Sequence, residues 1–359
     1  MATAIIHAGM GKTGSSSIQL WLAANMNILS EKYGTNVLRA YVRSDEETGR
    51  LKCILQQVEE DTHSDSNELV QASHSMVAEE KHAFYASFYS QLRDFLDRGI
   101  NVIISAEAFY TLLVNYNHAF LTPLNNIAEK HNVHVAYYVR PQDEAMESAW
   151  RQWGFRTNMA PHKYLLSYEK SLHYYNTYLK LIEVAPKVKF TLRPYRNDLL
   201  SSGNVVTDFV NNILGLNEAE FTNSRSVWVN PTLPLEIVNL MRALPRNVLW
   251  SSPHDNIKLN RLKRIFAFDD GDGSERTRKS RQIIKNYCYS KFEKENESML
   301  HEMKWGADEF ITGLNNKESA LGGKLEEVDE LWKTKASRAE LEFIARLLEN
   351  IEDIDAGAK

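Results

Sequence analysis

Short apolar runs alternate with amphipathic segments through the first two thirds of the chain. Apolar runs of strand length occupy Ala4–Ala8, Asn36–Val42, Asn101–Ser105, Val133–Val139 and Val188–Tyr195. Helical periodicity lies between them, over about Ser15–Lys32, Glu68–Asp97 and His162–Val184. Strands that alternate with helices predict an α/β fold with a mostly parallel central sheet flanked by helices.

After about Leu214 the pattern becomes mainly helical. We therefore expect an α/β core over 1–215, a helical part over 216–325 that completes a cleft, and an amphipathic helical tail over 326–359. A loop of turn formers at Asp269–Ser274 interrupts the helical part. Its spacing lacks the later Glu of a calcium loop, and no metal site is expected.

Composition narrows the class of protein. With 359 residues, 43% of them hydrophobic and 25% charged, the chain can form a sizeable globular core. The two cysteines, Cys53 and Cys288, predict neither a disulfide framework nor a zinc site. A net charge of -5 argues against a nucleic-acid-binding protein.

No basic segment precedes the first apolar run, and the uncharged stretch Ala108–Ala128 contains Pro, His and several Asn, so we expect a cytoplasmic protein without a transmembrane segment.

A glycine-rich turn follows the first predicted strand and precedes a predicted helix. Residues 8–17 read Ala-Gly-Met-Gly-Lys-Thr-Gly-Ser-Ser-Ser. The N–H groups of such a P-loop-like turn converge on one concavity, to which Lys12 adds a positive charge. In an ATP-binding P-loop the first glycine would stand at Ile6, so a nucleotide with a single 5′ phosphate that bears a transferable group suits this turn better. The alternative is an ordinary strand-to-helix turn.

Arg140 follows the predicted strand Val133–Val139 and precedes Ser148 by eight positions. Pro141 biases Arg140 toward an extended conformation and suits the start of a helix, so the guanidinium is expected at the carboxyl edge of the sheet. Ser148, about two turns into that helix, can face the same edge and add a hydroxyl to a phosphate held by Arg140. The alternative is an arginine that satisfies carbonyl groups at the sheet end.

Together these motifs resemble those of the sulfotransferases that use 3′-phosphoadenosine 5′-phosphosulfate (PAPS). The run 12–16 is similar to their phosphosulfate loop, with Gly11 in place of a proline, and Arg140 with Ser148 is similar to their 3′-phosphate pair. The segments 192–216, 229–244 and 292–300 resemble bacterial carbohydrate-type members. Ser17 stands where small-molecule members stack a tryptophan on adenine, so the adenine contacts are not assigned.

The resemblance implies an enzyme that transfers a sulfuryl group from PAPS to a hydroxyl, with a carbohydrate as the acceptor and without a metal. It also implies a set of residues that bind PAPS: Gly11, Lys12, Thr13, Gly14, Ser15, Ser16, Arg140 and Ser148.

Sulfuryl transfer needs a base for the acceptor hydroxyl and positive charge at the bridging oxygen. Lys12 can supply the charge. Glu107 follows the predicted strand Asn101–Ser105, and related enzymes carry a His or Glu at this place, so Glu107 is our candidate base. The alternative is a glutamate that complements a helix dipole. His7, inside the first strand, is expected to be a packed core histidine.

Two other functions remain open at this stage. A P-loop kinase or NTPase would bind ATP with magnesium, and a non-catalytic nucleotide- or glycan-binding module would bind 3′,5′-ADP without transferring sulfate. The stretch 257–285 carries nine basic residues against four acidic ones. It is either a solvated helix face or a segment that closes over the cofactor or the acceptor.

Overall fold

The computed structural model describes residues 1–46, 48–58, 76, 78–115, 118–157, 159–221, 233–242, 274–305 and 324–332. The chain forms two compact units, and each draws on three stretches that are far apart in the sequence. The first unit comprises Met1–Arg140, His173–Trp228 and Glu297–Phe310. The second comprises Pro141–Leu172, Val229–Asn296 and Ile311–Lys359. The predicted loop at 269–273, most of the basic stretch and the tail beyond 332 lie outside the described residues.

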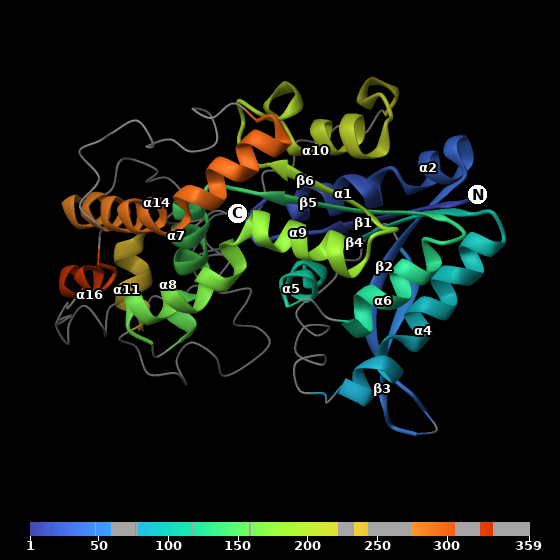
Figure 1. Cartoon of the computed structure of the whole chain (residues 1–359), viewed down its shortest axis with the longest axis horizontal. Coiled ribbons are helices and arrows are strands. Elements are labelled where there is room, and N and C mark those ends of the chain that lie inside the picture. The colour runs from blue at the N-terminus through green and yellow to red at the C-terminus, as the bar shows by residue number, and fades with distance from the viewer. Residues whose placement is uncertain are drawn as a thin grey trace, which may run out of the picture. The chain divides into compact units, whose positions relative to one another are not determined.

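A six-stranded sheet forms the centre of the first unit (Figure 1). The strands are Thr3–Ala8 (β1), Thr35–Ser44 (β2), Leu51–Gln57 (β3), Asn101–Ala106 (β4), Asn132–Val139 (β5) and Lys189–Pro194 (β6). Their order is β3-β2-β4-β1-β5-β6, and all neighbours are parallel except β2 and β3, which form an antiparallel hairpin. The predicted α/β fold with a mostly parallel sheet is therefore confirmed, whereas β3 was not predicted.

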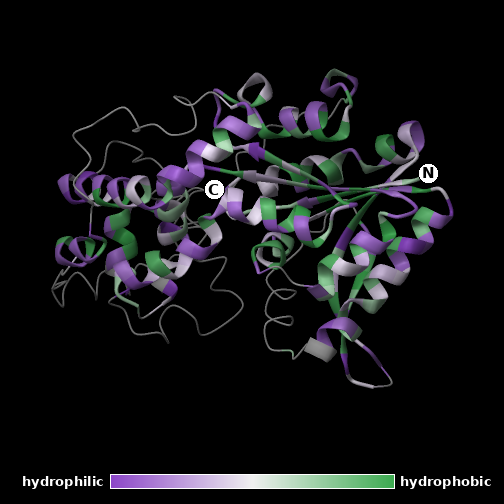
Figure 2. Cartoon of the chain, in the orientation of Figure 1, coloured by the Kyte–Doolittle hydropathy of each residue, from purple (hydrophilic) through white to green (hydrophobic). Residues whose placement is uncertain are grey.

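The three central strands are apolar on both faces. Ile6 of β1, Ile104 of β4 and Val135 of β5 are completely buried. Figure 2 shows the strands of the sheet mainly in the hydrophobic colour, while the helices around them carry both colours. Strands covered by helices on both sides read as continuous apolar runs, which is why the sequence pattern located them.

Helices cover both faces of this sheet (Figure 1). One face packs against Ser15–Ala24 (α1), Met26–Tyr33 (α2), Val205–Asp208 (α10) and the π-helix Phe209–Leu214 (η4). The other packs against Ala78–Asp97 (α4), Ala108–Val114 (α5), His118–Ile127 (α6) and Tyr174–Val184 (α9). The helix predicted over Ser15–Lys32 is divided at Asn25, whose side-chain amide donates to the carbonyl oxygen of Trp21.

The second unit is helical in its described part. It contains Gln142–Trp153 (α7), Pro161–Glu169 (α8), Leu235–Arg242 (α11), most of Glu275–Met303 (α14) and Glu326–Leu331 (α16). Trp150 is fully buried, and the ring of Trp332 meets it edge-on at 6.1 Å. The expected helical C-terminal part is thus confirmed. In the part of the chain that the structure describes, no helix combines the length and the apolar character that crossing a bilayer requires.

Candidate functional site

The strand order of the first unit predicts where a ligand binds. The connection that leaves β1 leads to β2 on one side of it, and the connection that leaves β5 leads to β6 on the other side. In open α/β sheets, ligands bind outside the carboxyl ends of two strands whose connections diverge in this way. The glycine-rich turn follows β1 and Arg140 follows β5, so the turn and this arginine both lie at this crevice.

Hydrogen bonds to one carbonyl group fix the shape of the glycine-rich turn. The backbone N–H of Thr13 and its hydroxyl donate to the carbonyl oxygen of Met10 at 3.3 and 2.7 Å. The hydroxyl of Ser15 donates to the same oxygen across 3.4 Å. Gly9 N donates to the carbonyl oxygen of Ala106 at 3.3 Å, which ties the turn to the end of β4. The hydroxyl protons of Thr13 and Ser15 therefore hold the turn together.

Three glycines of the turn serve different purposes. A Cβ on Gly9 would lie 2.2 Å from the Ser15 hydroxyl oxygen, and one on Gly14 would lie 2.6 Å from a methyl carbon of Val205. Gly14 also has φ +76°, a left-handed conformation that glycine adopts without strain. A Cβ on Gly11 would meet open space. Packing therefore requires glycine at positions 9 and 14, while Gly11 leaves room beside the backbone for an approaching ligand.

The N-terminus of α1 faces this turn. Gly14 is its N-cap residue and offers no side chain that could bond to the first helical N–H groups. The first turn, Ser15–Ser17, holds no acidic residue, and the first N–H groups of an α-helix point outward from its N-terminus. Together with the helix dipole, they make the start of this ten-residue helix suited to an anion. The side chains of Ser16 and Ser17 are half-buried at this end.

Lys12 adds positive charge in a strained backbone position. Its φ is +68°, in the left-handed region that disfavours residues with a side chain by roughly 1 kcal/mol. The ammonium group is buried. Strain of this kind persists where the surrounding structure imposes it, and it concentrates at functional sites. Position 12 therefore carries a lysine although its backbone conformation favours glycine, as expected for a residue with a functional role.

Glu107 stands beside the turn, as the sequence predicts. It is the N-cap residue of α5, but its carboxylate does not bond to the first N–H groups of that helix. Its Cγ would lie 3.2 Å from a Cβ on Gly9, so the side chain packs against the turn. Burial raises the pKa of Glu107, and the positive charge of Lys12 partly offsets that rise. The carboxyl group and the ammonium group therefore influence each other at one site.

Arg140 reaches the turn from the end of β5. Its Nη1 donates to the carbonyl oxygen of Lys12 at 3.3 Å. Its guanidinium lies 5.8 Å from the centre of the Tyr195 ring, a cation–π distance. Tyr195 is fixed in turn by a 2.6 Å bond from its N–H to the carbonyl oxygen of Val139. The same ring would lie 3.1 Å from a Cβ on Gly14, so Tyr195 contacts both predicted motifs.

Sequence reasoning missed Tyr195. It is the first residue after β6, at the same sheet edge as Arg140, and that position is the signal that could have identified it. Ser148, by contrast, is buried on α7 in the second unit, and its pairing with Arg140 stays a prediction. The triplet Arg278-Lys279-Ser280 lies inside α14, where the Ser280 hydroxyl accepts a bond from the Trp332 indole N–H at 2.7 Å.

His7 is the packed core histidine that the sequence predicts. The ring is completely buried, its Nδ1 lies 2.8 Å from the Ser105 hydroxyl oxygen, and the Tyr138 and Phe209 rings meet it edge-on. Burial lowers its pKa to about 3, so the ring is neutral at physiological pH. Gln19 of α1 also donates to the backbone carbonyl oxygen of Ser105, at 3.4 Å. These contacts hold the end of β4 just before Glu107.

No protein-family model, curated protein or solved structure that was compared with the chain matches it. The case for a function therefore depends on the residues and their geometry.

Proposed function

We propose that the protein transfers a sulfuryl group from PAPS to an acceptor hydroxyl, with a carbohydrate hydroxyl as the acceptor class that the resemblance implies. The observation that carries the proposal is the 3.3 Å contact between Arg140 and the carbonyl oxygen of Lys12. It joins the glycine-rich turn to the arginine of the second motif within one unit, at the crevice where the strand connections diverge.

The residues of the turn fit a 5′ phosphosulfate group. The N–H groups at the start of α1 and the space beside Gly11 offer donors and room for an anion. Arg140 would hold the 3′-phosphate with its forked donors, which suit phosphate oxygens, and Ser148 remains its predicted partner. Tyr195 would keep the guanidinium in place during binding.

When bound, PAPS supplies an activated sulfuryl group. Glu107, in its ionised form, would accept the proton of the acceptor hydroxyl as the new oxygen–sulfur bond forms. Lys12 would stabilise the negative charge that develops on the bridging oxygen as the old oxygen–sulfur bond breaks. The proton thus moves to the Glu107 carboxylate and the electron pair to the departing phosphate, close to a buried ammonium group.

A transfer assay tests this proposal. Purified protein is incubated with radiolabelled PAPS and a panel of carbohydrate acceptors, and label is counted in the separated sugars. We expect transfer to at least one acceptor by the native protein and strongly reduced transfer by Glu107→Gln, which keeps the shape of the side chain but cannot accept the proton. Binding of 3′,5′-ADP without transfer to any hydroxyl would favour the non-catalytic module.

A further inference from the structure

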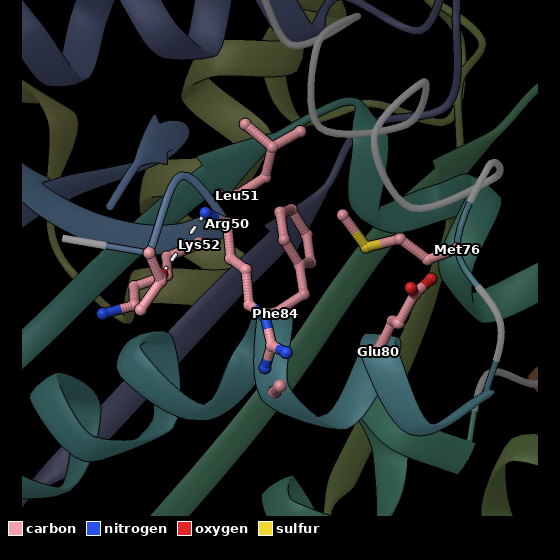
Figure 3. A pocket seen from close by; sticks show the side chains of 8 residues that line it. Arg50, Leu51, Lys52, Met76, Glu80 and Phe84 are labelled. Atoms are coloured by element: carbon pink, nitrogen blue, oxygen red, sulfur yellow. Dashed lines mark hydrogen bonds between the residues drawn. The ribbon is translucent and has the colours of Figure 1, made fainter. Parts of the chain in front are cut away.

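A pocket of about 610 Å³ lies between the β2–β3 hairpin and the start of α4 (Figure 3). Its volume falls within the range of small-molecule sites. None of the residues that line it belongs to the glycine-rich turn. The described residues that line it come from the hairpin and from the start of α4 together with Met76: Thr48, Arg50, Leu51, Lys52, Met76, Glu80, Ala83 and Phe84.

The hairpin wall of this pocket is held in shape by Asp45. The carboxylate of Asp45 accepts bonds from the backbone N–H and the hydroxyl of Thr48 at 2.8 and 2.6 Å, and it forms an ion pair with Lys52. The backbone N–H of Gly49 donates to the carbonyl oxygen of Asp45 at 2.9 Å, and Gly49 has φ +67°, which favours glycine. These bonds hold Thr48 and Arg50 in place between β2 and β3.

The opposite wall is equally well supported. Phe84 of α4 is 1% exposed and its ring meets the Tyr85 ring edge-on at 4.9 Å. The side-chain oxygen of Gln91, further along α4, accepts a 2.6 Å bond from the N–H of Leu55 in β3. The helix and the hairpin are thus tied together by a hydrogen bond between residues that do not themselves line the pocket.

The pocket combines an apolar surface with a cation. Leu51 is 42% exposed although it is a large apolar residue, and it lies on this pocket with Met76, Ala83 and Phe84. Figure 3 shows the Arg50 side chain running alongside the Phe84 ring, with Met76 and Glu80 on the other side of that ring.

The two cations of the hairpin wall differ in their partners. Lys52 is neutralised by Asp45. No hydrogen bond or ion pair within the described ranges engages the guanidinium of Arg50, which is exposed. A guanidinium beside an apolar surface suits a ligand that pairs a hydrophobic ring with a carboxylate or a sulfate, because its fork matches the geometry of such groups.

We propose that this pocket binds a small organic anion whose apolar ring packs on Leu51 and Met76 and whose carboxylate or sulfate group binds Arg50. The pairing of β2 with β4 ends at Leu38 and Ile104, while β2 and β3 continue to pair as far as Ser44 and Leu51. The hairpin therefore extends past the carboxyl edge of the sheet. The pocket is a site of its own and does not depend on the proposed sulfuryl transfer.

The test uses three probes that share a naphthalene ring and differ in charge: 2-naphthoate, the neutral 2-naphthamide and the cation 2-(aminomethyl)naphthalene. The full chain is labelled with ¹³C at the methyl groups of its nine methionines, and each probe is titrated while the signals are followed by NMR. Met76 reports on the pocket and Met10 on the glycine-rich turn, and Met76→Leu and Met10→Leu assign the two signals. We expect 2-naphthoate to shift Met76 but not Met10, and to bind more tightly than the other two probes.

Variants separate the charge from the fold. Arg50→Gln should weaken 2-naphthoate by about five- to tenfold and leave 2-naphthamide unchanged, as expected for a charge-assisted bond at an exposed site. Arg43→Gln is the matched control, because Arg43 belongs to the same hairpin, pairs with the exposed Glu46 at 3.4 Å and does not line the pocket. Glu80→Gln should leave 2-naphthoate binding equal or tighter and should weaken the cationic probe.

The proposal is overturned if Met76 does not respond to 2-naphthoate at about 5 mM, a weak-binding limit. It is also overturned if the cationic probe binds more tightly, or if Arg50→Gln and Arg43→Gln behave alike. Titration of the same sample with 3′,5′-ADP keeps the two proposals apart. A silent Met10 in that titration would count against the sulfuryl-transfer site and would leave the result at Met76 untouched.

Discussion

Arg140 and Lys12 are 128 positions apart in the chain, yet Nη1 of Arg140 donates to the backbone carbonyl oxygen of Lys12 at 3.3 Å. The contact links the end of β5 to the turn after β1. The acceptor belongs to a residue in the left-handed conformation, with φ +68°. A change at either residue should therefore alter how the other meets a bound anion.

Substitution of Lys12 should separate stability from activity. Lys12→Gly relieves a φ of +68°, so it should be about 1 kcal/mol more stable than Lys12→Ala in urea unfolding. Both variants should lose about 10²-fold or more in turnover at saturating PAPS, because the charge on the bridging oxygen is no longer stabilised. Lys304, with φ +55°, provides the matched control. Lys304→Gly should gain similar stability relative to Lys304→Ala and keep full turnover, and normal turnover in Lys12→Ala would refute the role of this turn.

Arg140→Ala should discriminate between nucleotides. If Arg140 holds the 3′-phosphate, the variant should bind 3′,5′-ADP about tenfold or more weakly than the native protein, while 5′-AMP loses much less. Isothermal calorimetry with both nucleotides measures the two losses. Arg98→Ala is the control, because Arg98 is an exposed arginine just after α4 that pairs with Asp94 of that helix. It should change the affinity for neither nucleotide. Equal losses for the two nucleotides in Arg140→Ala would place the 3′-phosphate elsewhere.

Glu107 should determine the acidic limb of the pH profile. Burial raises its pKa above the ordinary value, and the base is active only when ionised, so turnover should rise as pH increases through that raised pKa and then reach a plateau. Glu107→Gln should lose roughly 10²-fold in turnover and keep its affinity for 3′,5′-ADP.

The same group should leave a signature in stability. A carboxyl group whose folded pKa is raised makes the fold less stable as pH rises between its unfolded and folded pKa values. The native protein should therefore lose stability relative to Glu107→Gln over that interval, as measured by urea unfolding. An unchanged difference, together with near-normal turnover of the variant, would reject Glu107 as the base.

His7 should make the fold sensitive to acid. Its folded pKa of about 3 lies below the ordinary 6.5, so the unfolded chain takes up a proton first as pH falls. Stability from the neutral ring is then complete above pH 6.5 and decreases by about 1.4 kcal/mol per pH unit toward the folded pKa. His134, with a pKa of about 4, acts in the same direction, so the native protein is compared with His7→Asn at pH 7.5 and 5.5. Equal pH slopes for the two proteins would contradict this account of His7.

The sequence predicted the sheet where strands are buried on both faces, as at Ile6 and Val135, because such strands are continuous apolar runs. It missed β3, an edge strand in which only Cys53 and Leu55 are buried and the positions between and around them are partly or fully exposed, so the apolar pattern is too short to stand out. The assembly of each unit from three separate stretches leaves no trace in a pattern read along the chain.

The candidate site was predictable in part for a related reason. Lys12, Glu107 and Arg140 each follow a strand, and parallel strands bring their carboxyl ends to one edge. Tyr195 follows a strand as well, but a tyrosine at a strand end does not by itself indicate a function. Its role becomes apparent only from its contact with Arg140 in the structure. Ser148 lies on α7 in the second unit, where its spacing from Arg140 alone does not determine what it contacts.

Thermal unfolding with three nucleotides tests whether the site binds the nucleotide of PAPS. At about 100 times its dissociation constant, a ligand that binds only the folded chain adds about 2.7 kcal/mol of stability. We expect 3′,5′-ADP without metal to raise the melting temperature clearly more than 5′-AMP or ATP with magnesium at the same concentration, and Arg140→Ala to abolish this advantage. Stabilisation by ATP with magnesium that equals or exceeds that by 3′,5′-ADP would contradict PAPS binding and favour a P-loop kinase or NTPase.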